Sequence, residues 1–360
     1  MKILSFIVTT IFVLLIAFQW HLQHSHYQHG THQLVDDDDT LHYLQKYEFH
    51  QADRIPTGIY VDSLKFSGPN DVHVSGYIWQ EYSDELLVKH KPGVVFPDSV
   101  GGTIMKEAYK KNTDELTVIG WHFETNLRQA FSYSDYPIDH KTVWIKVLPS
   151  DFNSNAVLVP SLKAYDDTSK ESIFGISEDI VLSGWYLVES FFNYRPVSFD
   201  TDFGLHDHHP KTKIPELTFN IVIERDFLSA FMINITLLLV SIALLYSLII
   251  MTTSDERLRS KFGASVSSVI GSCAGIFFVV LIAHISIREQ FTGSGIVYIE
   301  YFYLISYLFI LGSAVSIYKF NSSEESARNY LLANDALVLK VGFWPLYTML
   351  ICIITWHHFY

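Results

Sequence analysis

Histidines gather in two polar segments of the chain, and this residue type suits a transition metal. One segment is the run His206-Asp207-His208-His209, and imidazole is a common ligand of zinc and copper. His206, His208 and His209 therefore form a candidate metal site. The alternative is an ordinary solvated loop, because the sequence has no HExxH or paired CxxC motif to complete a ligand set. The same two alternatives apply to the first segment, which carries His21, His24, His26, His29 and His32.

Other kinds of chemistry are poorly represented in the sequence. No nucleophile–base pair or hydrolase motif is present, so we expect that the protein is not an enzyme and needs no organic cofactor. The formal net charge of −13 argues against a nucleic-acid partner, which would require a basic face. The two cysteines, Cys273 and Cys352, lie inside apolar runs, which excludes a disulfide scaffold.

Hydropathy predicts five membrane-spanning helices, since a span needs about 20 largely apolar residues. They are expected at residues 3–20, 227–251, 262–287, 296–318 and 337–356. The first of them, within domain 1–20, is either a retained anchor or a signal peptide. It has a positive start and an apolar middle but no clear small-residue cleavage site.

Basic residues set the expected orientation, because cytoplasmic loops are enriched in lysine and arginine. Arg257, Arg259 and Lys261 lie between the second and third spans, and Lys319 and Arg328 lie between the fourth and fifth. We therefore expect a multi-pass protein with the long polar stretch between the first two spans outside the cytoplasm.

That polar stretch is expected to form a domain of strands. Alternating runs at residues 60–66, 72–79, 142–147, 180–188 and 217–223 are separated by turn residues, which is typical of an antiparallel β-sandwich or barrel. We assign residues 51–226 to this domain and residues 21–50 to an aperiodic His/Asp-rich linker. The predicted fold is an antiparallel β-sandwich followed by a four-helix transmembrane bundle at 227–360, plus the N-terminal hydrophobic helix.

This order of domains resembles the pentameric ligand-gated ion channels, of the prokaryotic type without the disulfide loop. Residues 133–141, YSDYPIDHK, are similar to the family's turn of aromatic, proline and aspartate ahead of a strand. Residues 76–79, GYIW, resemble the family's second strand, and Arg225 stands ahead of the second span like the family's arginine at that junction. The resemblance implies a homopentamer in a bacterial inner (plasma) membrane, with the β-domain in the periplasm.

The resemblance also implies that the span at 262–287 lines a pore. Helical spacing places small and hydroxylated residues along one face and a phenylalanine further out. The pore-lining candidates are Ala264, Ser267, Ser268, Gly271, Ala274, Gly275 and Phe278. The alternative is that the small residues allow close helix packing.

Selectivity candidates are Asp255 and Glu256, at the expected inner mouth beside the arginines. A carboxylate ring would favour cations there, whereas an arginine ring would oppose them. Residues 21–226 hold 31 acidic and 17 basic residues, and such an acidic vestibule concentrates cations. We therefore expect cation conduction.

In the family, ligands bind between subunits in a box of aromatic residues, which can hold a cationic amine. The candidates here are Trp79, Trp121, Trp185, Tyr186 and Tyr194. A proton is a rival ligand, because the exterior segment is rich in histidines and acids. Asp139, Arg225 and Arg288 are candidates for coupling the two domains, with Arg225 expected to pair with an acid such as Asp139.

The expected function is thus a ligand-gated, cation-conducting channel subunit that senses a small molecule or a proton. Two alternatives stay open. One is a non-conducting membrane receptor or assembly protein with the same fold, and the other is a membrane-bound metalloenzyme or metal-handling protein.

Overall fold

The computed structural model describes residues 1–25, 30, 32–47, 49, 51–113, 116–151, 155–201, 214–255, 266–322 and 332–360. The chain divides into two compact units. One unit is helical and comprises Met1–Tyr27, Ser132–Asp139 and Arg225–Tyr360; the other is rich in strands and comprises Gln28–Phe131 and His140–Glu224.

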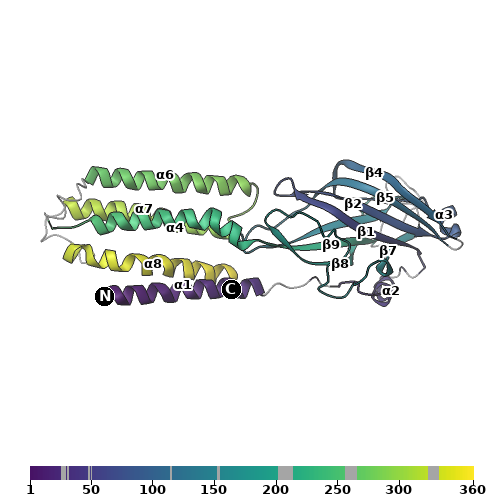
Figure 1. Cartoon of the computed structure of the whole chain (residues 1–360), viewed down its shortest axis with the longest axis horizontal. Helices are drawn as coiled ribbons and strands as arrows, with labels where there is room; N and C mark the ends of the chain where they lie inside the picture. The colour runs from purple at the N-terminus through teal and green to yellow at the C-terminus, as the bar shows by residue number, and fades with distance from the viewer. Residues whose placement is uncertain are drawn as a thin grey trace. The chain divides into compact units, whose positions relative to one another are not determined.

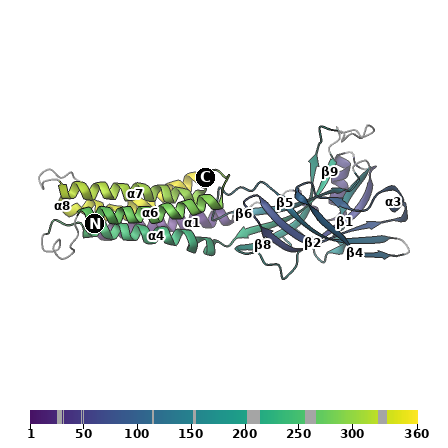
Figure 2. The ribbon, with the colours of Figure 1, turned by 90° about the horizontal axis from the view of Figure 1, so that it is seen from above.

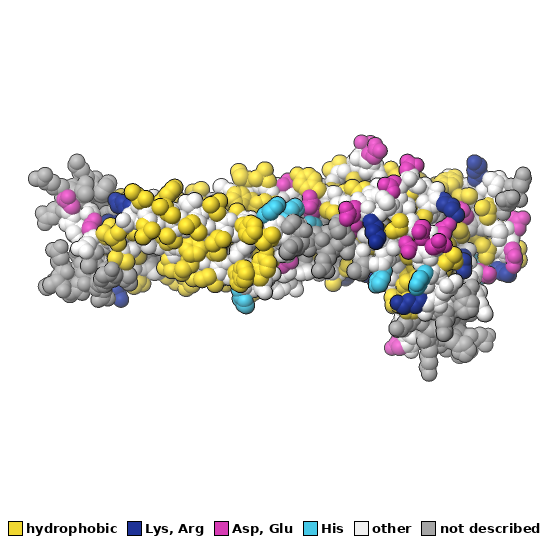
Figure 3. Space-filling view, turned by 90° about the horizontal axis from the view of Figure 1, so that it is seen from below, with side chains coloured by type: hydrophobic (Ala, Val, Ile, Leu, Met, Phe, Trp, Pro, Cys, Tyr) yellow, Lys and Arg dark blue, Asp and Glu magenta, His cyan; other side chains and the backbone are white. Residues whose placement is uncertain are grey.

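The helical unit holds five helices that are long and apolar enough to cross a membrane. They run side by side in a bundle (Figures 1 and 2) and are α1 (Lys2–Ser25), α4 (Phe227–Met251), α6 (Val266–Gln290), α7 (Tyr298–Ser322) and α8 (Ala333–Phe359). The predicted membrane spans are confirmed as helices of this kind, with ends that differ by a few residues. On the face shown in Figure 3, hydrophobic side chains predominate over the middle of the helices, as a lipid environment requires.

Local sequence explains where two of these helices begin and bend. Asp226 caps α4, because its side chain accepts a hydrogen bond from the backbone N–H of Ser229 at 3.3 Å. The first turn of α8 is irregular, since Asn334 and Asp335 have left-handed backbone angles. Pro345 lies inside α8 and removes one backbone donor there.

The strand-rich unit contains two sheets. The five-stranded sheet has the order β4-β5-β2-β1-β7, and the four-stranded sheet has the order β3-β6-β9-β8. The strands are β1 (Asp53–Phe66), β2 (Asp71–Tyr82), β3 (Val94–Val95), β4 (Ser99–Asn112), β5 (Thr117–Arg128), β6 (His140–Pro149), β7 (Ala156–Pro160), β8 (Trp185–Val197) and β9 (Ile214–Arg225).

Inward-facing residues of both sheets form one hydrophobic core. Ile59 and Ile78 from the first sheet and Ile145 and Phe219 from the second are all fully buried members of it. Their neighbours along each strand point away from the core, which is the alternation that the sequence showed. The prediction of a β-rich domain is confirmed, but its strands are not all antiparallel, since β1 pairs with β7 in parallel.

The structure confirms one of the predicted strand pairs and corrects the start of another predicted strand. The predicted hairpin is confirmed, because β1 pairs antiparallel with β2 and Phe66 lies opposite Val72. The predicted strand at 180–188 is wrong in its first half, since β8 begins only at Trp185. Gly184 precedes it with φ of +78°, a left-handed turn conformation that interrupts a strand.

The linker at 21–50 was expected to be aperiodic, and this is wrong for part of it. Residues Asp37–Lys46 form helix α2, capped by Asp36, whose side chain accepts a hydrogen bond from the N–H of Asp39 at 2.8 Å. The acidic first turn suits the positive end of the helix dipole. Leu44 is fully buried, so the helix belongs to the core of the strand-rich unit. A short helix, α3 (Asp84–Lys89), follows β2.

Candidate functional site

Helix α6 buries one narrow stripe and leaves the rest of its surface exposed. The buried residues are Val269, Cys273, Val280 and Ile287, which recur at spacings of four and seven. In its apolar stretch 17% of the residues are buried, against 39% in α4 and in α7, 22% in α8 and 11% in α1. A helix that is so apolar and yet so exposed requires further apolar surroundings, from lipid or from other copies of the chain.

The predicted pore-lining residues lie on the side of α6 away from the buried stripe. At about 100° per residue, Gly271 and Phe278 lie within about 15° of the direction opposite that stripe. Ser267 lies within about 35° of that direction, and Ser268, Ala274 and Gly275 flank it. All six are exposed. A Cβ atom built on Gly271 or Gly275 meets no other atom within 4 Å, so the small residues do not provide close packing within this chain.

The same face continues beyond Phe278 with residues that the sequence analysis did not select. Ile282 and Ile285 are 65% and 48% exposed, compared with 59% for Phe278. Glu289 lies near the end of the helix, within about 15° of the same direction, and forms no ion pair with any described residue. The exposed face therefore runs from small and hydroxylated residues, through bulky apolar ones, to a carboxylate. A helical wheel of the sequence would have found these three residues.

One of the two predicted selectivity residues and one predicted pore-lining residue lie outside the described part of the chain. Ala264 and Glu256 are outside the described residues. Asp255 is described and exposed, and its N–H donates a hydrogen bond to the Thr253 hydroxyl at 3.2 Å.

The loop at residues 132–139 folds against the helices of its own unit. Tyr136 is buried, and its hydroxyl accepts a hydrogen bond from the Asn234 side-chain amide on α4 at 2.6 Å. The rings of Tyr133 and Tyr136 both pack, tilted, against that of Phe291, between α6 and α7, with ring centroids 4.9 and 4.7 Å away. The N–H of Tyr298 donates to the Ser134 carbonyl at 2.7 Å. This loop thus contacts α4, the α6–α7 connection and the start of α7.

Arg225 and Asp139 form a buried ion pair within the same cluster. The guanidinium donates to both carboxylate oxygens, with 3.0 Å between Nη2 and Oδ2. The side chains are 12% and 3% exposed. The guanidinium also lies over the ring of Tyr136, 4.7 Å from its centroid. The predicted pairing of Arg225 with Asp139 is confirmed; its role in coupling stays a prediction.

Arg288 takes part in a second charged cluster, near the C-terminal end of α6 and the N-terminal end of α7. Its Nη1 donates to Glu300 Oε2 at 3.1 Å and to the Gly295 carbonyl at 3.0 Å. Glu300 is buried and also accepts the N–H of Val297 at 2.8 Å. His284 Nε2 lies 3.4 Å from Glu300 Oε1. This cluster fixes the connection between α6 and α7.

The five predicted ligand-binding aromatics are not brought together within the chain. Tyr194 is in the core, where its hydroxyl donates to the Leu158 carbonyl at 2.9 Å. Trp121 is also a core residue, whereas Tyr186 is 56% exposed. Trp79 pairs with Gly58 near the start of β1, whereas Trp185 stacks on Phe66 at the end of that strand.

Within the chain, Trp185 and Phe131 hold one of the protein's own cations, the Lys141 ammonium. Lys141 is buried, and its ammonium lies 5.7 Å from the ring centroid of Trp185 and 5.3 Å from that of Phe131. These distances are typical of cation–π contacts.

A buried carboxyl on the outer side of the four-stranded sheet has unusual surroundings. Glu216 is 3% exposed, and burial raises the pKa of its carboxyl to about 7. Among its charged neighbours, Lys146 and Arg195 lower this pKa, whereas Asp98 raises it. Lys146 pairs with Asp98 at 3.1 Å. The Arg195 guanidinium lies 4.6 Å from the Trp144 ring centroid. Sequence reasoning missed this group, because nothing in its local pattern marks Glu216 as buried.

The predicted metal residues His206, His208 and His209 lie outside the described residues. A scan against protein-family models and a search of curated proteins both return no match to this chain. The arrangement of helices and strands is therefore the basis of any functional assignment.

Proposed function

We propose that the chain is a subunit of a homopentameric, cation-conducting ligand-gated ion channel of a bacterial inner membrane. The observation that carries the proposal is the exposed face of α6, opposite its buried stripe. Five copies of this helix around an axis would place that face on a pore. The other exposed sides of α6 would pack against neighbouring copies.

The residues on this face suit a gated pore. Phe278 and Ile282 are one helical turn apart, about 6 Å along the axis, and would form two adjacent apolar rings. Such rings exclude water when narrow and conduct when widened. Ser267 and Gly271 would line a wider inner half that hydrates a passing ion.

The acidic residues of the chain favour conduction of cations over anions. Five copies of Glu289 would form a carboxylate ring at the outer end of the pore face. The acidic excess of residues 21–226 acts in the same direction, because it raises the local concentration of cations. Asp255 at the inner end adds a further acid.

The buried pair Arg225–Asp139 supports a coupling role for the loop at 132–139. Arg225 ends β9 and immediately precedes α4, while the loop lies between β5 and β6 and contacts three parts of the helical unit. A movement of the strands that end at this loop would therefore reach α4 and the α6–α7 connection. Glu216, on β9, is the group best placed to sense a proton, and the exposed Tyr186 stays a candidate for a small-molecule ligand.

Cysteine accessibility along α6 tests the proposal. In a background with Cys273→Ala and Cys352→Ala, single cysteines would replace Gly271, Ile282 or Val280. A positively charged thiol reagent should modify the first two and block the current, whereas the buried position 280 should stay protected. Modification of all three positions, or of none while current flows, would contradict a pore on this face.

A further inference from the structure

Helix α1 is docked in the bundle at both of its ends. Near its start, the Ser5 hydroxyl donates a hydrogen bond to the Val341 carbonyl of α8. Near its end, the Trp20 indole N–H donates to the Tyr298 hydroxyl at 2.8 Å, and that hydroxyl also bonds with the Thr355 side chain at 2.6 Å. These contacts tie α1 to α7 and α8.

Aromatic packing continues the contact onto α4. The Trp20 ring meets the rings of Phe227 and Phe231 edge-on, with centroids 5.4 and 6.5 Å away. Ile16 is also buried on this side of α1, at 7% exposure, whereas Phe18 is 56% exposed. One face of α1 thus belongs to the bundle and the other faces outward.

Between α1 and the other helices lies a cavity of about 410 Å³. Its walls come from α1, α4, α7 and α8, and α1 lines it from Thr9 to Trp20. Eleven residue steps along a helix cover about 16 Å. The cavity is therefore elongated along α1.

The chemistry of the walls excludes a charged occupant. Apart from hydroxyl groups, the lining side chains are aliphatic or aromatic, and none carries a charge. The Thr9 hydroxyl oxygen is buried and has no hydrogen-bond partner among the described residues. An engineered apolar cavity of about 150 Å³ already takes up benzene, so a void of this size in hydrocarbon surroundings will be filled. An elongated apolar space between membrane-spanning helices fits a flexible hydrocarbon chain.

We propose that α1 is retained as a fifth membrane helix and that, with α4, α7 and α8, it encloses a binding site for one acyl chain of a membrane phospholipid. The site depends on α1, because five of its lining residues come from that helix. This inference is independent of ion conduction, since it concerns a different surface from the exposed face of α6.

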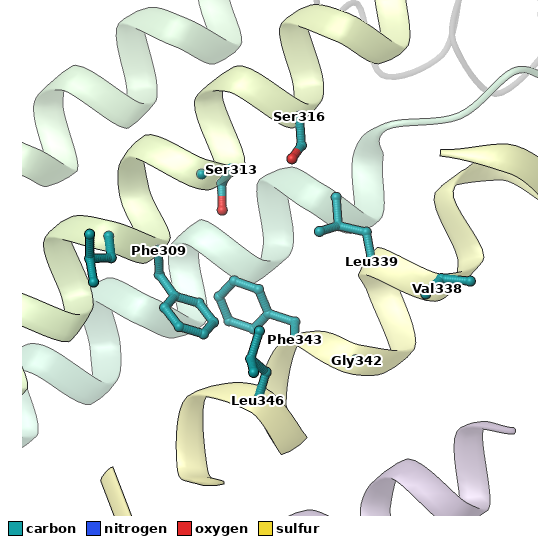
Figure 4. Close-up of a pocket in the computed structure, with 10 residues that line it drawn as sticks. Phe309, Ser313, Ser316, Val338, Leu339, Gly342, Phe343 and Leu346 are labelled. Atoms are coloured by element: carbon teal, nitrogen blue, oxygen red, sulfur yellow. The ribbon is translucent and has the colours of Figure 1, made fainter. Parts of the chain in front are cut away.

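A second cavity in the same unit provides an internal control. It has about 380 Å³ and lies between α7 and α8, where Phe309, Ser313, Phe343 and Leu346 surround it (Figure 4). It has no residue from α1 in its lining. A change on α1 should therefore leave its occupancy unaltered.

Photolabelling of the full-length protein tests the proposal. The protein would be reconstituted in phosphatidylcholine and phosphatidylglycerol vesicles that contain a phosphatidylcholine with a diazirine in the middle of one acyl chain. After illumination, mass spectrometry would locate the label and establish whether residues 1–20 are present. We expect an intact N-terminus and label on Tyr347, Thr348 or Ile351 of α8.

Two variants fill the cavity from different walls: Ala17→Trp on α1 and Leu239→Trp on α4. Leu14→Trp is the control, because it adds the same side chain to α1 at an exposed position outside the lining. Each filling variant should lower labelling of the α8 wall at least about tenfold, because excluding about two methylene groups already has that effect. Leu14→Trp should not lower it, and labelling at Phe343 and Leu346 should stay constant.

Three results would overturn the proposal: a mature protein that lacks α1, an α8 wall that is not labelled, or equal labelling in the filling and control variants. If Ala17→Trp prevents folding, Leu239→Trp still decides the question, because it leaves α1 unchanged.

Discussion

The pH dependence of Glu216 gives the most quantitative prediction of this structure. Its carboxyl is almost fully buried, and burial raises its pKa to about 7 from an ordinary value of 4.5. The neighbouring Lys146 and Arg195 lower this pKa but do not cancel the cost of burial. The folded protein therefore binds a proton at Glu216 more tightly than the unfolded chain does.

The sign of the effect follows from this difference. Below about pH 4.5 the Glu216 carboxyl is protonated in both the folded and the unfolded state, so its burial does not lower the free energy of unfolding. As the pH rises from about 4.5 to about 7, the unfolded chain releases the proton first, so the free energy of unfolding falls. A shift of 2.5 units at about 1.36 kcal/mol per unit gives a loss of roughly 3 kcal/mol, complete above about pH 7.

Glu216→Gln keeps the size of the side chain and removes its titration. The variant should match the natural protein at pH 4 and exceed its stability by about 3 kcal/mol at pH 8. For a unit of this size, that is a difference in melting temperature of roughly 6–12 °C. Thermal unfolding of the full-length protein in detergent, followed by tryptophan fluorescence at both pH values, measures it.

Glu107→Gln, at an exposed position on β4, is the matched control and should show no such divergence. The reasoning would be refuted if Glu216→Gln and the natural protein differed by the same amount at pH 4 and pH 8. If the natural protein were more stable than Glu216→Gln at pH 8, the predicted direction of the effect of Glu216 on stability would be wrong.

Three further predictions concern the helical unit. Asp139→Asn leaves the buried Arg225 charge without its carboxylate and should destabilise the protein by about 3–5 kcal/mol, measured as a lower melting temperature; an unchanged melting temperature would show that the pair is unimportant. Phe278→Ser should hydrate the apolar ring and produce a standing current without ligand in planar bilayers, and a silent variant would argue against a gate there. Glu289→Gln should reduce cation over anion permeability, and an unchanged reversal potential in asymmetric salt would exclude this residue from selectivity.

The membrane spans were predictable because their signal is local. A run such as residues 227–251 is apolar over its whole length, and no distant contact is needed to make it a helix. The pairing of Arg225 with Asp139 was also predictable, since a charge beside a membrane helix needs a partner. The β1–β2 hairpin followed from its turn residues.

Features that depend on tertiary packing could not be predicted in this way. Helix α2 was hidden in a polar segment, and its buried Leu44 is recognisable only once the core is assembled. Glu216 has the same sequence appearance as an exposed strand residue, yet a central strand and its neighbours bury it. The predicted ligand-binding aromatics lie apart within one chain, because Trp79 pairs with Gly58 and Trp185 stacks on Phe66 at the end of β1, which neither residue's own sequence reveals; a box between subunits stays a prediction.

The central claim is that α6 lines a cation-conducting pore, and recording from the purified protein tests it most directly. Protein shown to be pentameric would be fused into planar bilayers in asymmetric potassium chloride, with the outer side stepped from pH 8 to pH 4 and then exposed to a set of small amines. The account predicts currents whose reversal potential lies toward that of potassium. Pentameric protein that stays silent under every condition, or that passes chloride in preference to potassium, would contradict it.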